Sequence, residues 1–253
     1  MKIIDRPQLI TYDGSLEGFF TVIFEIYLHK YPVEKIVKVN QYKSDLFSDP
    51  LFIETDLPKA ERVLRKVAEK VGKPTMQSIL ATFLAEKEAP EMQLLEFIKK
   101  VLNNQLADKD FRDDHMLAVH QIAQMVKMEA HRFKGFIRFK LSKDGIYTAT
   151  IEPDHDILPL ISSHFKSRYA DQQWIIFDLK RQKGLFYLNG KLELLHSTDQ
   201  VYGLAKEDLH ENEIMLQDMW KEYFKHVNIS ERKNLRLQRQ HMPSRYWKYL
   251  VEK

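Results

Sequence analysis

The segment Ile151–Asp178 constrains the fold more than any other stretch of this chain. It places three carboxylates and one histidine within the five residues Glu152–Asp156, and it ends in the apolar run Trp174–Leu179, which is typical of a strand. Between them, apolar residues recur at the spacing of an amphipathic helix: Ile157, Leu160, Ile161 and Phe165. The segment therefore predicts a helix that packs on a sheet, with a polar junction before it.

Further strands are predicted on both sides of this segment. Phe136–Leu141 alternates with period two, and Tyr147–Ile151 follows after the turn signal Lys143-Asp144-Gly145. Gly184–Leu188 and Leu192–His196 are joined by Asn189-Gly190, a strong hairpin signal. We expect an α+β fold: a mostly antiparallel sheet with helices packed on one side, plus a helical middle lobe.

The chain is expected to form a single compact unit over residues 1–253, with three sub-regions. Residues 1–56 predict a strand–helix–strand element, in which Asp13 or Ser15 caps the helix. Residues 57–132 predict the helical lobe, and residues 133–253 the antiparallel sheet and a basic C-terminal tail.

Composition excludes several classes of protein. The chain has no cysteine, which excludes disulfides, thiolate metal sites and cysteine nucleophiles. It contains no apolar run of about 18 residues and no hydrophobic signal peptide, so we expect a cytoplasmic protein without a membrane partner. Without a glycine-rich nucleotide loop or a spaced histidine motif, no cofactor and no metal site are predicted.

The cluster Glu152, Asp154 and His155 has two interpretations. Carboxylates and an imidazole that converge could act as acid and base on a substrate, with Asp13 as a further candidate. However, adjacent residues at a strand end point in different directions, and Asp154 or Asp156 would also serve as the N-cap of the next helix. A structural junction is the favoured interpretation, and the catalytic one stays open.

Basic stretches with aromatic residues nearby favour nucleic-acid binding. One stretch contains Arg138 and Lys140, a hairpin tip contains Arg181, and the tail Asn228–Lys253 is rich in arginine. Cations neutralise phosphates and aromatic rings stack on bases. The candidate contacts are Arg138, Lys140, Arg181, Arg232, Arg239, Arg245, Tyr246 and Trp247. A solvated surface is the alternative for each stretch taken singly.

Several longer motifs are distributed along the chain. They are Tyr12-Asp13-Gly14-Ser15 with Glu17-Gly18-Phe19, His131 with Phe136-x-Arg138-Phe139, and Ile151–Pro159 with His164-Phe165. Two more are Arg168-x-Ala170-Asp171-Gln172-x-Trp174 and His241-Met242-Pro243-x-Arg245-Tyr246-Trp247. Together they resemble an uncharacterised bacterial family of probable DNA metabolism proteins, and the similarity covers essentially the whole chain.

The resemblance implies that the protein functions alongside other proteins of DNA metabolism. Such proteins accompany a radical-SAM protein of DNA modification or repair, and a similar domain is fused elsewhere to a uracil-DNA glycosylase-like domain. We therefore expect a DNA-binding or accessory protein of DNA repair or modification that acts with a radical-SAM partner. The alternatives are a nucleic-acid hydrolase, glycosylase or lyase that uses Glu152, Asp154 and His155, and a protein–protein adaptor that docks its helical lobe without DNA contact.

Overall fold

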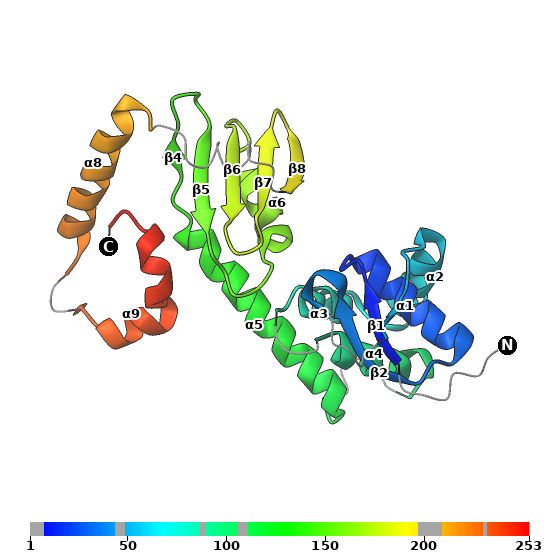
Figure 1. Cartoon of the computed structure of the whole chain (residues 1–253). Coiled ribbons are helices and arrows are strands. Elements are labelled where there is room, and N and C mark those ends of the chain that lie inside the picture. The colour runs from blue at the N-terminus through cyan, green and yellow to red at the C-terminus, as the bar shows by residue number, and fades with distance from the viewer. Residues whose placement is uncertain are drawn as a thin grey trace. The chain divides into compact units, whose positions relative to one another are not determined.

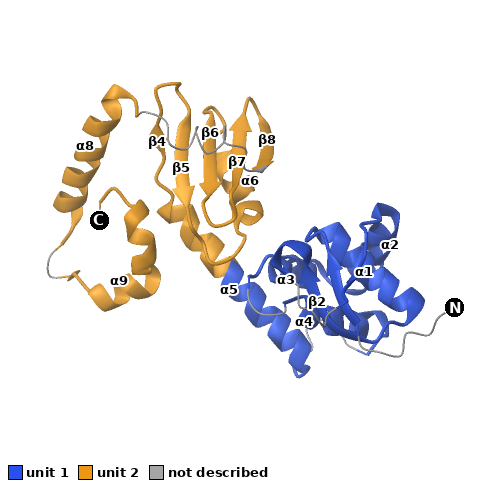
Figure 2. Cartoon of the chain, viewed as in Figure 1, with its two compact units in different colours: residues 1–126 blue, residues 127–253 orange. Residues whose placement is uncertain are grey.

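The computed structural model describes residues 8–43, 49–86, 90–105, 111–196, 209–229 and 232–252, and it has the expected α+β architecture (Figure 1). Residues 1–7, part of the expected first strand, and Lys253 of the basic tail lie outside the described residues. The chain divides into two compact units, residues 1–126 and residues 127–253 (Figure 2). The expectation of a single unit stays a prediction, and each unit is described by itself.

The first unit is built on a small parallel sheet. Its strands β1 (Gln8–Tyr12), β2 (Val33–Lys38) and β3 (Leu51–Phe52) lie in the order β2-β1-β3, and β1 pairs in parallel with both neighbours. Helix α1 (Leu16–His29) connects β1 to β2, because parallel neighbours need a crossover rather than a tight turn. The strands and the helix were predicted, but the parallel pairing was not.

Helices form the rest of the first unit. A 3-10 turn η1 (Val39–Gln41) follows β2, and the helices are α2 (Leu57–Lys70), α3 (Lys73–Phe83), α4 (Pro90–Leu102) and the first part of α5 (Asp114–Phe136). Apolar side chains from these helices, including Val67, Ile79 and Phe97, pack with Phe19 and Phe20 of α1 into one core. The predicted helical lobe is confirmed.

The start of α1 explains the Asp-Gly-Ser motif of the first unit. Ser15 caps the helix by accepting a hydrogen bond from the backbone N–H of Gly18 at 2.9 Å. Asp13 accepts from the Ser15 backbone N–H at 2.9 Å and from the Thr55 hydroxyl at 2.8 Å. A Cβ at Gly18 would lie 2.2 Å from the Asp13 carboxylate, so a larger residue there would have to displace this carboxylate. Asp13 thus holds the turn, and Ser15 is the cap.

The second unit contains the predicted antiparallel sheet. Strands β4 (Lys140–Leu141), β5 (Tyr147–Ile151), β6 (Trp174–Asp178), β7 (Lys183–Leu188) and β8 (Lys191–His196) lie in the order β4-β5-β6-β7-β8. Every pair is antiparallel except β5 with β6, which are joined by helix α6 (Leu158–Arg168) and run parallel.

Two local expectations for the second unit were wrong. Helix α5 continues to Phe136, so the predicted strand Phe136–Leu141 shortens to Lys140–Leu141. The N-cap of α6 is Ile157, without a side-chain cap, in place of Asp154 or Asp156. Asp156 instead forms an ion pair with Lys183 of β7, and this interaction takes the carboxylate away from the helix end.

Apolar side chains cover both faces of the central strand β6. Trp174 packs on Phe165 of α6 with ring centroids 6.1 Å apart, and Ile175 and Phe177 point to the opposite face, where they form a second apolar cluster. Both faces are buried because the side chains of a strand alternate. Strand β6, which pairs with β5, is therefore packed on both faces.

The C-terminal segment of the second unit is helical. Helix α8 (Glu211–Val227), helix α9 (Leu235–His241) and the 3-10 helix η3 (Ser244–Tyr249) follow one another. Asn234 caps α9 by accepting from the Leu237 backbone N–H at 3.0 Å. In the described part of the chain, no helix is long and apolar enough to cross a membrane.

Candidate functional site

The junction Glu152–Asp156 is organised around a carboxylate that lies far away in the sequence. Glu129 of α5, which is 6% exposed, accepts the backbone N–H groups of Asp154 and His155, each at 2.8 Å. It also accepts the hydroxyl of Tyr246 from η3 at 2.5 Å. One buried carboxylate thus joins the long helix, the junction and the C-terminal segment. Such a group is stable because its lone pairs meet three donors.

The predicted catalytic side chains are separately engaged. Glu152 forms an ion pair with Lys248 and accepts the Tyr249 hydroxyl at 2.7 Å. Asp154 forms an ion pair with Arg245, and His155 is 8% exposed. The hydrogen bonds from Lys248 and Tyr249 hold the pKa of Glu152 below its usual value, so this carboxylate is ionised near neutral pH. The contacts describe a structural junction, and the catalytic role stays a prediction.

Arg181 fastens the junction to the β6–β7 hairpin. Its guanidinium donates to the carbonyl oxygens of Pro153 at 3.2 Å and Asp154 at 2.8 Å, and to the carboxylate of Asp178 at 2.6 Å. Asp178 is fully buried, and burial raises its pKa against the opposing effect of the Arg181 charge. The guanidinium is therefore largely occupied by the protein, and its predicted contact with nucleic acid is untested.

The aromatic residues predicted to stack on bases also have partners within the unit. Tyr246 is 2% exposed, and its ring lies against Phe133 with centroids 4.8 Å apart. The Arg245 guanidinium covers the Tyr246 ring at 4.6 Å. The indole N–H of Trp247 donates to the carbonyl of Met242 at 2.9 Å. These contacts pin η3 onto the end of α5, and stacking on bases stays a prediction for both residues.

Arg138 joins the end of α5 to the C-terminal residues. Its guanidinium donates to Glu252 at 2.6 Å and to the carbonyl of Gly135 at 2.7 Å, and it lies 5.6 Å from the ring of Trp220. Burial would raise the pKa of Glu252, but the hydrogen bonds from Arg138, its own backbone and Trp220 lower it overall. Lys140 is exposed on β4. Arg138 therefore contacts Glu252 and Trp220, whereas Glu152 contacts Lys248 and Tyr249, so the two residues meet different C-terminal side chains.

We expect the second unit to lose stability in acid. Glu152 and Glu252 have folded pKa values below the ordinary 4.5, so their stabilisation is complete above that pH and is lost as the pH falls through the lowered values. Asp178, whose pKa is raised, acts in the opposite direction. The free energy of unfolding, measured by urea titration at a series of pH values, should fall below about pH 4.5.

Tryptophan fluorescence reports the unfolding of the second unit specifically, because Trp174, Trp220 and Trp247 all belong to that unit. Replacing Glu252 by glutamine should make the acid loss shallower than in the wild type. Glu193→Gln, at an exposed position of β8, is the matched control and should retain the wild-type loss. An acid loss of equal size in the Glu252→Gln variant would contradict the assignment.

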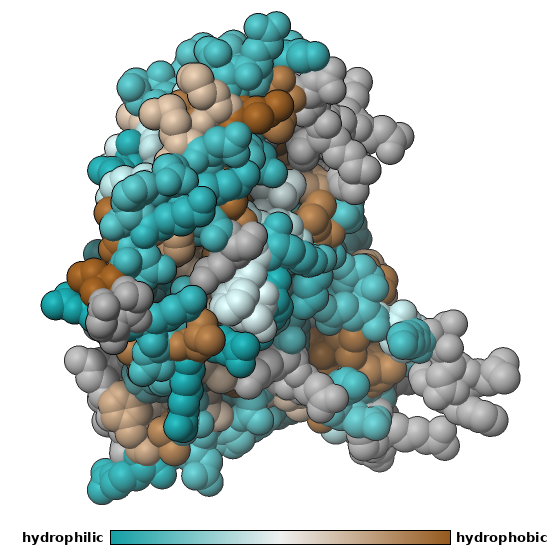
Figure 3. Space-filling view, turned by 90° about the vertical axis from the view of Figure 1, so that its left-hand side faces the viewer, coloured by the Kyte–Doolittle hydropathy of each residue, from teal (hydrophilic) through white to brown (hydrophobic). Residues whose placement is uncertain are grey.

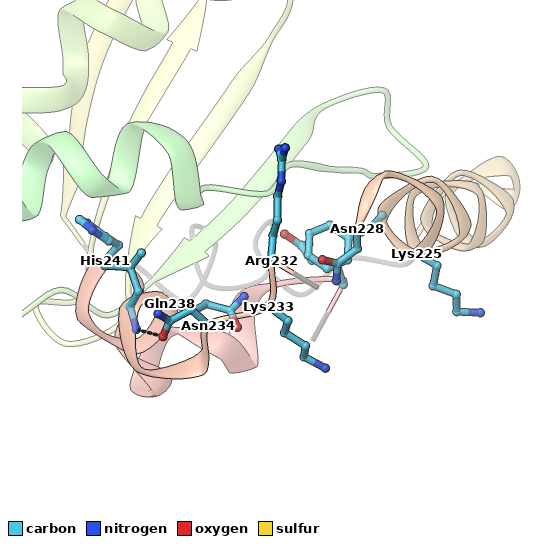
Figure 4. A pocket seen from close by; sticks show the side chains of 10 residues that line it. Lys225, Asn228, Arg232, Lys233, Asn234, Gln238 and His241 are labelled. Atoms are coloured by element: carbon cyan, nitrogen blue, oxygen red, sulfur yellow. Dashed lines mark hydrogen bonds between the residues drawn. The ribbon is translucent and has the colours of Figure 1, made fainter. Parts of the chain in front are cut away.

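A cationic pocket lies between α8 and α9 in the second unit. It has a volume of about 560 Å³, and cationic and amide side chains line it from both helices and from the segment between them (Figure 4). Its lining residues are Phe224, Lys225, Asn228, Arg232, Lys233, Asn234, Leu237, Gln238, His241 and Glu252. We call this site the α8–α9 pocket. Of the predicted nucleic-acid contacts, Arg232 lines it directly.

The exposed cations of the C-terminal segment differ from the other predicted contacts. Their side chains are exposed, and none forms an ion pair with another described residue. We call them the C-terminal cations: Arg232, Lys233, Arg236 and Arg239. Since no protein carboxylate in the described part of the chain neutralises them, they remain available to an anionic ligand.

Helix α8 also exposes an apolar flank. Met215, Met219 and Tyr223 are 57%, 61% and 58% exposed, and Leu216 and Val227 lie beside them on the same flank. Figure 3 shows the side of the molecule on which α8 lies, where apolar residues are interspersed among hydrophilic ones. The inner face of the helix is different: it turns Glu213 and Phe224 toward the rest of the unit.

Glu129 is the residue of the junction that the sequence analysis missed. It lies three residues after Val126 and four before Phe133, both of which are buried. A carboxylate on the apolar stripe of a helix is unusual, because an ionised group is buried only when it is paired. The position of Glu129 on this apolar stripe was the sequence feature that could have revealed its role.

No group of three metal-ligating side chains comes together within the described ranges. The chemistry that the unit offers is that of hydrogen-bonded carboxylates and exposed cations.

Comparisons with known proteins place the chain in one family. A search of curated proteins and a search of solved structures each found no match. The model of a domain of unknown function, DUF4130, matches residues 88–252, which include the whole described part of the second unit. Because this match covers more than half of the sequence, the chain belongs to the DUF4130 family.

Proposed function

We propose that this protein binds DNA through the C-terminal cations and supports DNA repair or modification together with a radical-SAM partner. The observation that carries the proposal is the exposure of Arg232, Lys233, Arg236 and Arg239 without a carboxylate partner in the described part of the chain. Cations of this kind bind phosphates with release of counterions. The motif resemblance to proteins of DNA metabolism supports the DNA assignment and the radical-SAM partner.

The candidate cations differ in the partners that they have within the second unit. Arg138, Arg181 and Arg245 each donate to carboxylates or carbonyl oxygens of the second unit, so binding DNA would require them to exchange partners. Arg232 and Arg239 need no such exchange. The proposal therefore assigns phosphate contact first to the C-terminal cations, with exposed Lys140 as a further candidate on the sheet.

A binding titration across salt concentrations tests the proposal. Fluorescence anisotropy of a labelled oligonucleotide should give an association constant that falls as salt rises, with a log–log slope of roughly −4 if four phosphates are neutralised. The titration is run with the protein alone and with the radical-SAM partner added. Absence of salt-dependent binding in both arms would overturn the proposal.

A further inference from the structure

The α8–α9 pocket carries features that a phosphate-binding patch alone does not need. Amide side chains from three places in the chain, Asn228, Asn234 and Gln238, line it together with the ring of Phe224. Amides both donate and accept hydrogen bonds, as the edges of nucleobases require. The Asn234 carbonyl oxygen already accepts from Leu237, so its amide nitrogen is the group that remains as a donor. The pocket thus combines an aromatic surface with polar groups of both kinds.

Positive charge surrounds these groups. Arg232 and Lys233 contribute cationic side chains to the lining, and His241 contributes an imidazole (Figure 4). Lys225 adds a third cation, which forms an ion pair with Glu222 at 3.1 Å. Glu252 is the one carboxylate among the described residues that line the pocket, and its oxygens accept from Arg138 at 2.6 Å and from Trp220 at 3.0 Å. The negative charge of Glu252 is therefore partly compensated, and the net charge of the lining favours an anion.

The concave shape of the site favours single-stranded over double-stranded DNA. Its volume of about 560 Å³ lies within the range of small-ligand sites, roughly 300–1,000 Å³. In a duplex, bases are stacked and paired, and proteins read their edges with elements that protrude into a groove. A concave pocket can receive a base only when that base is unpaired and unstacked.

We infer that the α8–α9 pocket binds an unpaired nucleotide of single-stranded DNA. This inference rests on the proposed DNA binding and names its substrate form. The base stacks on Phe224, the amides of Asn228 and Gln238 bond its edge, and the flanking phosphates meet Arg232 and Lys233. The site therefore prefers single strands over duplexes, whereas the cations alone would bind both.

The test compares one oligonucleotide as a single strand and as a duplex, at equal salt, with the full chain. The single strand should bind roughly 10-fold more tightly, and Phe224→Ala should remove that advantage while duplex binding is retained. Phe224→Trp should restore it, because a ring is again present. Tyr223→Ala on the exposed flank of α8 is the matched control and should leave the preference unchanged.

The other outcomes distinguish failure of DNA binding from failure of the single-strand preference. If neither form of DNA binds, the proposed function fails and the inference fails with it. If both forms bind equally, or Phe224→Ala weakens both equally while unit 2 remains folded by tryptophan fluorescence, DNA binding stands and the single-strand inference is overturned. A single-stranded oligonucleotide with abasic sites should bind no more tightly than the duplex.

Discussion

Removing the four C-terminal cations together is expected to weaken DNA binding by on the order of 100-fold at fixed salt. The variant replaces each by glutamine: Arg232, Lys233, Arg236 and Arg239. Each lost phosphate contact should also reduce the salt slope by about 1, because fewer counterions are released. Both quantities come from the same anisotropy titration. Stability should change little, since these side chains are exposed and unpaired with other described residues.

A charge-matched variant distinguishes a DNA-binding site in the C-terminal segment from nonspecific electrostatic attraction between the whole protein and DNA. It removes four exposed cations of the first unit, again by glutamine substitution: Lys35, Arg62, Arg65 and Lys66. Its net charge equals that of the C-terminal variant, so a nonspecific effect would weaken both equally. We expect the control to retain most of the wild-type affinity and slope. Equal losses in the two variants would contradict a binding site in the C-terminal segment.

Replacing Glu129 by alanine should lower the free energy of unfolding of the second unit by about 3 kcal/mol. The substitution leaves the N–H groups of Asp154 and His155 and the hydroxyl of Tyr246 without their acceptor. Each buried donor that loses its partner costs about 1–3 kcal/mol, although relaxation and water reduce the sum. Urea unfolding followed by tryptophan fluorescence measures the effect in this unit.

Two further variants make that result specific. Tyr246→Phe removes one of the three donors and should cost less than Glu129→Ala. Met128→Ala changes the neighbouring residue of the same helix, which is 48% exposed, and should stay within about 0.5 kcal/mol of the wild type. If Glu129→Ala were no more destabilising than Met128→Ala, the carboxylate would not organise the junction.

Local patterns predicted most of the elements of this chain. Turn signals located β5, β7 and β8, and helical spacing located α6, because such patterns depend on residues close together in sequence. The end of α5 was misplaced for the same reason: Phe136–Leu141 satisfies a strand pattern, and only its surroundings extend the helix to Phe136.

The polar cluster Glu152–Asp156 shows the limit of local patterns. Its composition drew attention to catalysis, but the groups that decide its state are Glu129, Arg245 and Lys248, which are far away in sequence. No spacing rule connects these residues. The structure also divided the predicted cations into two sets. Some, such as Arg138 and Arg181, bind a carboxylate or carbonyl of the protein, and others, such as Arg232, are exposed.

By itself, the sequence determined an α+β fold, the strand–helix–strand run that begins at β5, and a basic C-terminal tail. These follow from periodicity and charge, which are properties of neighbouring residues. Only the tertiary structure decided that Ile151–Asp178 opens with a hydrogen-bonded junction, and that residues of α8 and α9 line a common cationic pocket. Burial and partner choice depend on which distant segments meet, and that is fixed by packing rather than by local pattern.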